Sequence, residues 1–356
     1  MSSHHLPKNV LVTGANGYIG NAVARAFVRA GWTTYGLIRS VSASHALAIE
    51  EILPVTGSID DLSLHETITG QLPSSIDTIV SVTEDFRDYV THYNNIVALL
   101  RNISAMSAAN GIIPLVIFTS GCKDYGIGPH FADDPDLAPH TEEDAVNPPS
   151  FLQFRAHFAQ KIFENSDAFS PVLVRPTNVH GRSSSYYGLF FEVAQKAAES
   201  GKPLVMTSRP ETICHSLHVD DCGDAYVAIA SHPRPTEVKG QVFNISARRY
   251  ETVAQLGQAL VSEYNIAQGL QYVDSKTLAD GHGWPPFLID FPQWTGSDKL
   301  RRVTGWSNCR PLFTDSIHVD RVAYEASKAT ALQNIEKMNA RWSEITAKSA
   351  GEQQRK

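Results

Sequence analysis

The segment Val10-Leu-Val-Thr-Gly-Ala-Asn-Gly-Tyr-Ile-Gly20 carries the strongest indication of the fold of this chain. Its first four residues form a short apolar run rich in β-branched side chains, which predicts a buried strand over residues 9–13. Residues 21–31, NAVARAFVRAG, then place small and apolar side chains at three- and four-residue spacings and end on a glycine, as an amphipathic helix does. The predicted order is therefore strand, tight turn, helix.

Three glycines occupy that turn at GxxGxxG spacing: Gly14, Gly17 and Gly20. The first permits a tight turn, the second lets an anionic group approach the backbone, and the third lets the helix pack closely on the strand. Free backbone N–H groups at the start of the helix favour a pyrophosphate. We expect a dinucleotide to bind through Gly14, Asn16, Gly17, Tyr18, Ile19 and Gly20.

Strand-like runs and helical patterns alternate along the first half of the chain. The runs cover residues 33–38, 76–82, 115–120 and 170–176, and a long helical pattern covers residues 92–111. Such alternation requires crossover connections between parallel strands. It predicts an α/β protein with a Rossmann-type, doubly wound parallel sheet.

Turn-rich stretches begin after residue 178 and predict a smaller C-terminal substrate lobe. We expect the dinucleotide-binding domain at residues 1–178, with later returns of the chain near 213–246. The expected substrate lobe comprises residues 179–212 and 247–325, and residues 326–356 are expected to form a C-terminal helix and tail.

The composition excludes several classes of partner. Lys and Arg number 30 against 37 Asp and Glu, a formal net charge of −7, which argues against nucleic acid or an anionic membrane surface. The four cysteines are far apart and never form CxxC, so neither a metal site nor a disulfide framework is expected. The first residues lack the apolar stretch of a signal peptide, and no run is long enough to span a bilayer. We expect a cytoplasmic protein with a small-molecule substrate.

The end of the second strand indicates which dinucleotide binds. An acidic residue there usually holds the ribose 2′-hydroxyl, whereas a basic residue accommodates a 2′-phosphate. This chain has Gly36-Leu-Ile-Arg-Ser40, in which Arg39 can pair with a phosphate and Ser40 can donate to it. We therefore expect NADP(H) rather than NAD(H). The alternative is that Arg39 is an ordinary solvated side chain.

With these motifs in place, the sequence resembles the extended and atypical short-chain dehydrogenase/reductase family, which includes NAD(P)-dependent epimerases and dehydratases and dihydroflavonol-type reductases. The resemblance runs over roughly residues 9–310. It rests on TGANGYIG at 13–20, VTGSIDDLSL at 55–64, IDTIVSVTE at 76–84, VLVRPTNVHG at 172–181 and SLHVDDCGDAYVAI at 216–229.

The resemblance implies further dinucleotide contacts and an assembly. It implies an adenine contact at the Ile59 backbone, ribose contacts at Ser81, Val82 and Thr83, and nicotinamide contacts at Pro176, Asn178 and Val179. A homodimer is also expected, on the resemblance alone.

The catalytic pattern departs from that of the family. Members that move a hydride carry Tyr and Lys four residues apart on one helix, with a Ser or Thr on a neighbouring strand, because the Lys lowers the Tyr pKa and the Tyr exchanges a proton with the substrate. The helix expected here, NPPSFLQFRAHFAQKIFEN at 147–165, has no tyrosine. The position of the usual hydroxyl, four residues before Tyr125, is Gly121.

Four other side chains are the candidate catalytic residues: Ser120, Tyr125, His157 and Lys161. Ser120 stands one residue before the usual hydroxyl. His157 and Lys161 stand four apart, so they can share one helical face, with the imidazole exchanging the proton. The alternative is that both are solvated surface side chains.

These inferences predict an NADP(H)-binding oxidoreductase or an epimerase/dehydratase-like enzyme. Its expected substrate is a small carbonyl, polyol or sugar-derived compound, and its triad is non-standard. The alternative is a catalytically silent NADP(H)-binding sensor or scaffold protein, because the missing Tyr-x-x-x-Lys pair is also what loss of turnover would leave.

Overall fold

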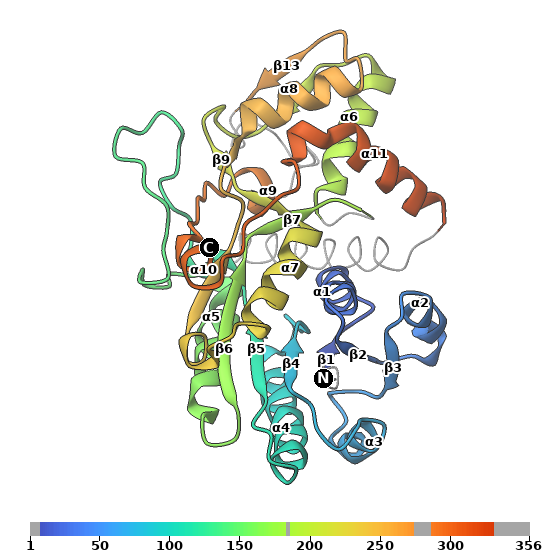
Figure 1. Cartoon of the computed structure of the whole chain (residues 1–356). Helices are drawn as coiled ribbons and strands as arrows, with labels where there is room; N and C mark the ends of the chain where they lie inside the picture. The colour runs from blue at the N-terminus through green and yellow to red at the C-terminus, as the bar shows by residue number, and fades with distance from the viewer. Residues whose placement is uncertain (1–7, 183–185, 274–285, 331–356) are drawn as a thin grey trace, which may run out of the picture.

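The computed structural model describes residues 8–182, 186–273 and 286–330. A seven-stranded sheet forms its centre, in the order β11-β6-β5-β4-β1-β2-β3, and every pair in it is parallel (Figure 1). The strands are β1 (Asn9–Thr13), β2 (Thr33–Ile38), β3 (Leu53–Thr56), β4 (Thr78–Ser81), β5 (Leu115–Thr119), β6 (Ser170–Pro176) and β11 (Val242–Ile245). This confirms the predicted α/β class with a doubly wound parallel sheet.

The strands form where apolar, β-branched runs can be buried on both faces. In β1, Val10, Leu11 and Val12 are fully buried, as a strand covered by helices on both sides requires. β3 was not predicted from the sequence. It is the edge strand, and its Leu53 and Pro54 are exposed, so it lacks the apolar run that marks a central strand.

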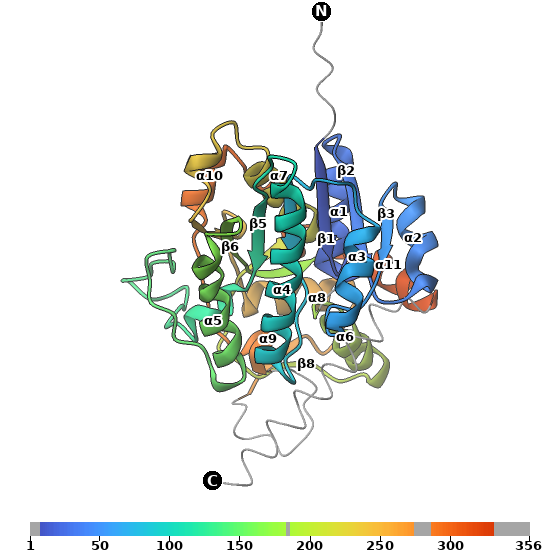
Figure 2. The same cartoon turned by 90° about the horizontal axis from the view of Figure 1, so that it is seen from below.

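Helices cover both faces of the sheet. One face carries α1 (Tyr18–Arg29), α2 (Ser44–Ile49) and α7 (Val219–Ala230), and the other carries α3 (His65–Gly70), α4 (Tyr89–Ala108) and α5 (Gln153–Gln160). Figure 2 shows α3, α4 and α5 side by side. On the first face Phe27 packs in one core with Tyr226, and on the second Ile68 packs in one core with Ile96. Fully burying a side chain such as Phe27 stabilises the fold by about 1.5–3 kcal/mol.

A second lobe lies at the carboxyl end of the sheet, where Figure 1 shows α6, α8 and α11 gathered together. Its aromatic and aliphatic core includes Phe190, Leu256, Leu288 and Phe313. Its helices are α6 (Gly188–Ser200), α8 (Val253–Glu263), α9 (Pro286–Ile289) and α11 (Phe313–Ala329). Its strands pair two by two: β7 (Asn178–His180) with β10 (Ser216–His218), β8 (Leu204–Met206) with β13 (Leu270–Tyr272), and β9 (Ile213–Cys214) with β12 (Glu251–Thr252).

The chain returns from this lobe to the sheet more than once. β11 pairs with β6, and α7 packs on α1. A later segment with α10 (Asp298–Thr304) was assigned to the substrate lobe from the sequence, but its Leu300 and Trp306 belong to the core that also contains residues of α1 and α7. The boundary predicted after residue 325 falls inside α11. Residues 1–7 and the predicted tail at 331–356 lie outside the described residues.

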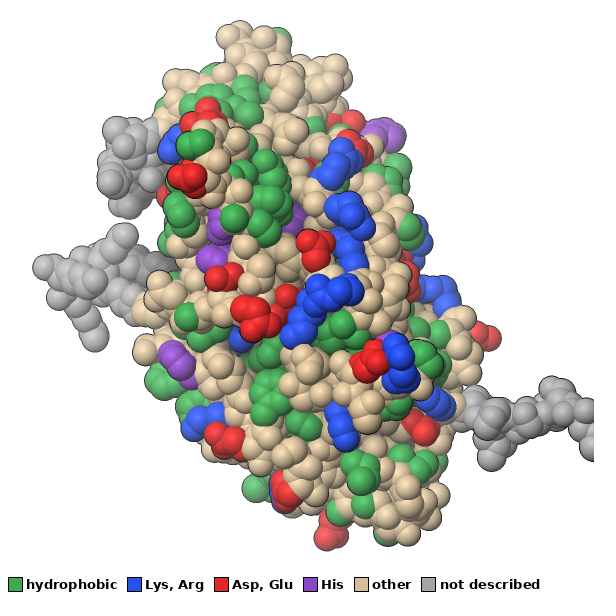
Figure 3. Space-filling model, turned by 60° about the vertical axis from the view of Figure 1, so that its left-hand side comes forward, with side chains coloured by type: hydrophobic (Ala, Val, Ile, Leu, Met, Phe, Trp, Pro, Cys, Tyr) green, Lys and Arg blue, Asp and Glu red, His purple; other side chains and the backbone are tan. Residues whose placement is uncertain are grey.

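Short 3₁₀ turns connect several elements. They are η1 (Val41–Ala43), η2 (Leu62–Leu64), η3 (Cys122–Tyr125), η4 (Ser150–Leu152), η5 (Lys161–Asn165) and η6 (Pro235–Glu237). Within the described part of the chain, no helix has the length and apolar character needed to cross a membrane. On the face drawn in Figure 3, acidic and basic side chains lie next to one another, so the net charge of −7 is not gathered there.

Candidate functional site

The glycine turn lies at the carboxyl end of β1, at the place in the sheet where the strand order reverses. Gly14 has a φ of +63°, a conformation that favours glycine. A Cβ at position 20 would lie 2.2 Å from the Gly14 carbonyl oxygen, so no side chain fits there. Gly17 caps α1 without a side-chain hydrogen bond, so no capping side chain occupies the first N–H groups of the helix.

The end of β4 lies beside this turn. Thr13 Oγ1 accepts the backbone N–H of Val82 at 3.2 Å, and Thr83 Cγ2 lies 3.0 Å from the position of a Cβ on Gly14. Ser81 Oγ and Thr83 Oγ1 are buried and have no hydrogen-bond partner among the described residues. Buried hydroxyls of this kind are normally satisfied, so this pair is available to the hydroxyls of a bound ligand.

A dinucleotide fits these residues. The turn offers backbone N–H groups to a pyrophosphate, and the unsatisfied hydroxyls of Ser81 and Thr83 lie at the next strand end. The Tyr18 hydroxyl is already used, because it donates to the Gly181 carbonyl at 2.5 Å and burial raises its pKa. Asn16 and Ile19 lie in the same turn and helix start and are half-buried.

The residues predicted for the dinucleotide ribose 2′-position follow β2, which pairs with β1. Arg39 is exposed, and it forms no ion pair within the part of the chain that the structure describes. Ser40 Oγ accepts the N–H of Ser42 at 3.3 Å and so caps η1. The Ala15 N–H, which donates to the Leu37 carbonyl at 3.3 Å, ties this strand end to the glycine turn.

The remaining predicted dinucleotide residues lie at neighbouring strand ends. Pro176 ends β6, and Asn178 and Val179 begin β7, at the carboxyl edge that also carries the glycine turn. Ile59 follows β3, and its carbonyl oxygen is 3.0 Å from His65 Nε2. The structure thus brings these residues to one edge of the sheet, and their contacts with a ligand remain predictions.

The exit of β5 carries a buried charge network. Asp124, in η3, is fully buried, and its carboxylate accepts hydrogen bonds from Ser120 Oγ and from Nε and Nη2 of Arg155, the last two at 3.0 and 2.7 Å. Arg155 Nη1 lies 3.4 Å from Glu84, and Arg175 Nε lies 3.5 Å from Asp124. Burial opposes the charge of Arg155, but the two carboxylates outweigh it and raise its pKa.

The predicted catalytic residues include neither Asp124 nor Arg155. Arg155 follows Phe151 by four residues, the spacing of the family's Tyr-Lys pair, and its guanidinium lies 3.3–3.5 Å from the position of a Cβ on Gly121. That spacing was the available signal. Phe151 has no exchangeable proton. The pair therefore supplies a cation, Arg155, but no phenol that could exchange a proton.

Tyr125 is buried, with its hydroxyl committed to other groups. It donates to Asn244 Oδ1 at 2.8 Å and accepts from Arg175 Nη1 at 3.0 Å, and its ring stacks on His140. Burial raises the pKa of Tyr125 despite the nearby Arg175 cation. This geometry anchors the loop after β5 to β6 and β11.

The structure does not bring His157 and Lys161 to this network. Both are exposed, and His157 Nδ1 lies 2.7 Å from the Gln153 carbonyl of its own helix. α5 ends at Gln160, so Lys161 begins η5, and its ammonium packs over the Phe158 ring. The four-residue spacing places both on the solvent side, whereas Arg155 faces the β5 exit.

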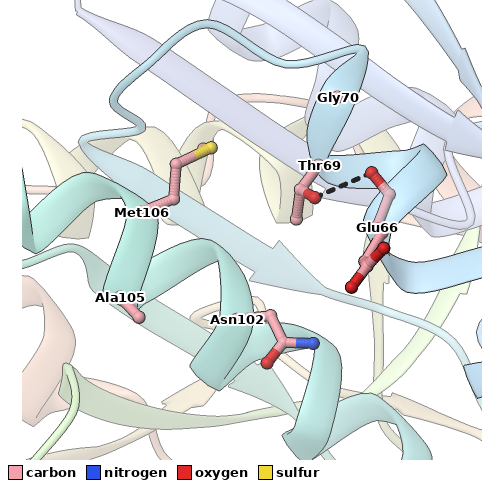
Figure 4. A pocket seen from close by; sticks show the side chains of 6 residues that line it. All are labelled: Glu66, Thr69, Gly70, Asn102, Ala105 and Met106. Atoms are coloured by element: carbon pink, nitrogen blue, oxygen red, sulfur yellow. Dashed lines mark hydrogen bonds between the residues drawn. The ribbon is translucent and has the colours of Figure 1, made fainter.

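A surface hollow lies away from the β5 exit. It lies between α3 and α4 and is lined by Glu66, Thr69, Asn102 and Met106 (Figure 4). It lies toward the amino end of the sheet, because Met106 is near the end of α4, and it offers no cluster of reactive groups. No group of three or more His, Cys, Asp or Glu side chains able to hold a metal ion occurs among the described residues.

Solved structures share this fold. A dTDP-glucose 4,6-dehydratase from Bacillus anthracis in complex with NAD is 17% identical, with 90% of this chain and 97% of that chain covered and a TM-score of 0.67. A UDP-glucose 4-epimerase with UDP-glucose from Thermotoga maritima is 17% identical, covering 90% and 99%, with a TM-score of 0.67. A UDP-Glc/GlcNAc 4-epimerase from Campylobacter jejuni is 17% identical, covering 90% and 99%, with a TM-score of 0.65. At these identities the likeness establishes the fold.

The comparison with curated proteins found no match. The model of the NAD dependent epimerase/dehydratase family matches residues 10–246, from β1 through β11. This match confirms the predicted family and the predicted enzyme class, NAD(P)-dependent and epimerase- or oxidoreductase-like. The chain belongs to the NAD dependent epimerase/dehydratase family.

Proposed function

We propose that this protein binds NADP(H) and exchanges a hydride with a small polyol, sugar-derived or other carbonyl substrate. The observation that carries the proposal is the glycine turn with its adjoining unsatisfied hydroxyls, Ser81 and Thr83, at the sheet edge that also bears the Asp124–Arg155 network. The bound dinucleotide supplies the two-electron hydride. The protein then has to bind it, orient the substrate oxygen and exchange a proton with that oxygen.

The preference for NADP(H) is supported by the end of β2. Arg39 is exposed and unpaired within the described residues, and no acidic side chain follows Ile38 in this strand exit. An acidic residue at this point would repel a 2′-phosphate, whereas a guanidinium can bind it through two hydrogen bonds.

Ser120 is the proposed oxygen-orienting group. Its hydroxyl donates to Asp124, which in turn is held by Arg155, so a buried network fixes Ser120 Oγ and leaves its lone pairs to accept from a substrate hydroxyl. Arg155 is a positioning residue for this network and supplies the positive charge that the family obtains from lysine. Tyr125 remains part of the proposal as an anchor of the loop, because its hydroxyl is occupied on both sides.

A compact substrate is supported by the state of the arginines in the second lobe. A nucleotide-sugar would require free cations for its phosphates. Several arginines of this lobe are already paired with carboxylates: Arg182 with Asp220 at 2.6 Å, Arg209 with Asp133 at 3.1 Å and Arg249 with Asp315 at 2.6 Å. A sugar or polyol without a nucleotide is therefore the proposed class.

The cofactor preference is tested by fluorescence titration of the purified chain with NADPH and NADH. We expect NADPH to bind about tenfold more tightly, the equivalent of about 1.4 kcal/mol for one charge-assisted contact. Arg39→Ser should remove the difference, and Arg234→Ser, a change at an exposed arginine of another surface, should not. Equal affinities for the two dinucleotides in the unaltered chain contradict the preference.

The activity is tested with a panel of aldoses, ketoses, small aldehydes and UDP-glucose, each incubated with NADPH or NADP⁺. Dinucleotide absorbance reports net redox turnover, and NMR of the sugar reports a redox-neutral change. Ser120→Ala should lower kcat, and His157→Ala, an exposed change on α5, should leave it unchanged. Tight NADPH binding without turnover of any compound supports the sensor alternative, for which the absence of a tyrosine in Ser150–Asn165 is the favouring observation.

A further inference from the structure

Lys123 lies between the two parts of the molecule. It belongs to η3, three residues after Ser120, at the carboxyl end of β5 between β4 and β6. Ligands of open α/β sheets bind at this edge. From the second lobe, Gln293 Nε2 donates to the carbonyls of Cys122 and Gly126 at 2.8 and 3.1 Å, which holds the loop around Lys123 in place.

The Lys123 side chain is partly buried against the second lobe. Its Nζ lies 3.8 Å from the centre of the Phe291 ring, and Cys214 of β9 lies near it. A cation over an aromatic face gains some stabilisation, but a phenylalanine ring replaces only part of the water that an ammonium loses. The amine is therefore held in a poorly hydrated position.

The charged and titratable groups around Lys123 do not compensate its charge. The carboxylate of Asp124, the next residue, is paired with Arg155, and no ion pair of Lys123 with an acid occurs among the described residues. Arg155 on α5 repels the ammonium. Burial raises the pKa of the Cys122 and Cys214 thiols to about 12, so both are neutral near pH 7.

Burial and the Arg155 charge together act against the ammonium form. Burial, the larger cause, lowers the pKa of Lys123 from 10.5 to about 7. An amine with such a pKa can hold or release a proton at neutral pH, which is the range in which proton exchange with a substrate is most efficient.

We propose that Lys123 Nζ is the group that exchanges a proton with the substrate oxygen, in the place of the absent tyrosine. The proposal rests on the proposed function and names a residue that sequence reasoning did not select. In the direction of reduction, a hydride adds two electrons to the carbonyl carbon, and the π pair moves to oxygen. The oxygen takes a proton from Lys123, and the neutral amine regains one from water.

The proton state of Lys123 is tested without a substrate. The full chain is acetylated with acetic anhydride over a pH series, and the extent of modification at Lys123 is measured by peptide mass spectrometry, with the exposed Lys239 as internal reference for the reagent. We expect half-maximal reactivity of Lys123 at about pH 7. Half-maximal reactivity above about pH 9 overturns the proposal, because the amine would then be permanently charged.

The catalytic role is tested with Lys123→Met and Lys123→Arg on the carbonyl that the panel identifies. Lys123→Met should lower kcat by about a hundredfold or more without changing the affinity for NADPH. Lys123→Arg keeps the cation but cannot release its proton, so it should remove the pH dependence of kcat near pH 7. Thermal melting of both variants checks that they fold.

The two proposals fail differently. A wild-type chain that binds NADPH and turns over no compound defeats the proposed function, and the role of Lys123 with it. A wild-type chain that turns over a carbonyl, with Lys123→Met retaining its kcat and pH profile, overturns the Lys123 proposal alone.

Discussion

Replacement of Asp124 by asparagine tests whether the network at the β5 exit depends on a buried negative charge. The change keeps the side-chain volume and removes the charge. The fully buried carboxylate accepts from Arg155 at 3.0 and 2.7 Å and lies 3.5 Å from Arg175 Nε. Removing one partner of a buried ion pair costs about 3–5 kcal/mol, because the other charge stays buried without compensation. Glu84, 3.4 Å from Arg155, remains as a counter-charge, so we expect about 3 kcal/mol.

Thermal unfolding followed by circular dichroism measures this effect. Unfolding entropy of about 2.1 cal/mol/K per residue makes each kcal/mol worth about 1.3 °C in Tm for a chain of 356 residues. Asp124→Asn should therefore lower Tm by about 4 °C. The matched control is Asp298→Asn, at a carboxylate that is 86% exposed and 3.5 Å from Arg301, which should melt within about 1 °C of the wild type. If Asp124→Asn also melts within about 1 °C, the network does not require the charge.

Three further changes test other parts of the structure. Gly20→Ala puts a methyl group 2.2 Å from the Gly14 carbonyl oxygen, and it should weaken NADPH binding about tenfold or more in a fluorescence titration. Unchanged affinity contradicts the role of the glycine turn in binding the dinucleotide. Lys123 has a folded pKa of about 7 against 10.5, so the unfolded chain binds the extra proton between these values and stability rises with pH across that window. Urea unfolding should show Lys123→Met to be about 2–4 kcal/mol more stable than wild type near pH 6, an advantage that falls below about 1 kcal/mol near pH 10; a difference independent of pH refutes the shift. Asp320→Ala removes the partner 2.7 Å from His180 Nδ1 and leaves a buried ring nitrogen unpaired, so urea unfolding should report a loss of about 1–3 kcal/mol, and a loss below about 0.5 kcal/mol counts against that pair.

The central strands could be predicted because their signals are local. The runs at 33–38 and 170–176 coincide with β2 and β6, and β1 occupies the predicted residues 9–13. An apolar, β-branched run between turn residues needs no distant partner to be recognised. β3 was missed because half of it faces solvent at the sheet edge, where the sequence carries no such run.

The domain limits were less predictable, because they depend on how later segments fold back. Leu300 and Trp306 come from a stretch assigned to the second lobe, yet they belong to the core that also contains residues of α1 and α7. Burial of apolar side chains is favourable in any core that a segment can reach, and the composition of the segment does not indicate which core it joins.

The glycine turn of the candidate site could be predicted. The Gly14, Gly17 and Gly20 spacing identifies a turn whose conformation is local, and the structure gives Gly14 the positive φ that the spacing requires. The residues of the buried charge network at the β5 exit could not be predicted in this way. His157 and Lys161 share a spacing but lie in solvent, whereas Arg155, on the same helix, reaches Asp124, thirty-one residues earlier in the chain.

Most strands of the sheet, the glycine turn and the family could therefore be recognised from short-range patterns of side-chain size and polarity. Which charged side chains pair with one another, and which lose their hydration, depends on contacts between segments that are far apart in the chain. Lys123 shows the physical reason: its sequence neighbours include an aspartate, which would favour the ammonium. Burial, and to a smaller extent repulsion by the distant Arg155, lower its pKa to about 7 instead.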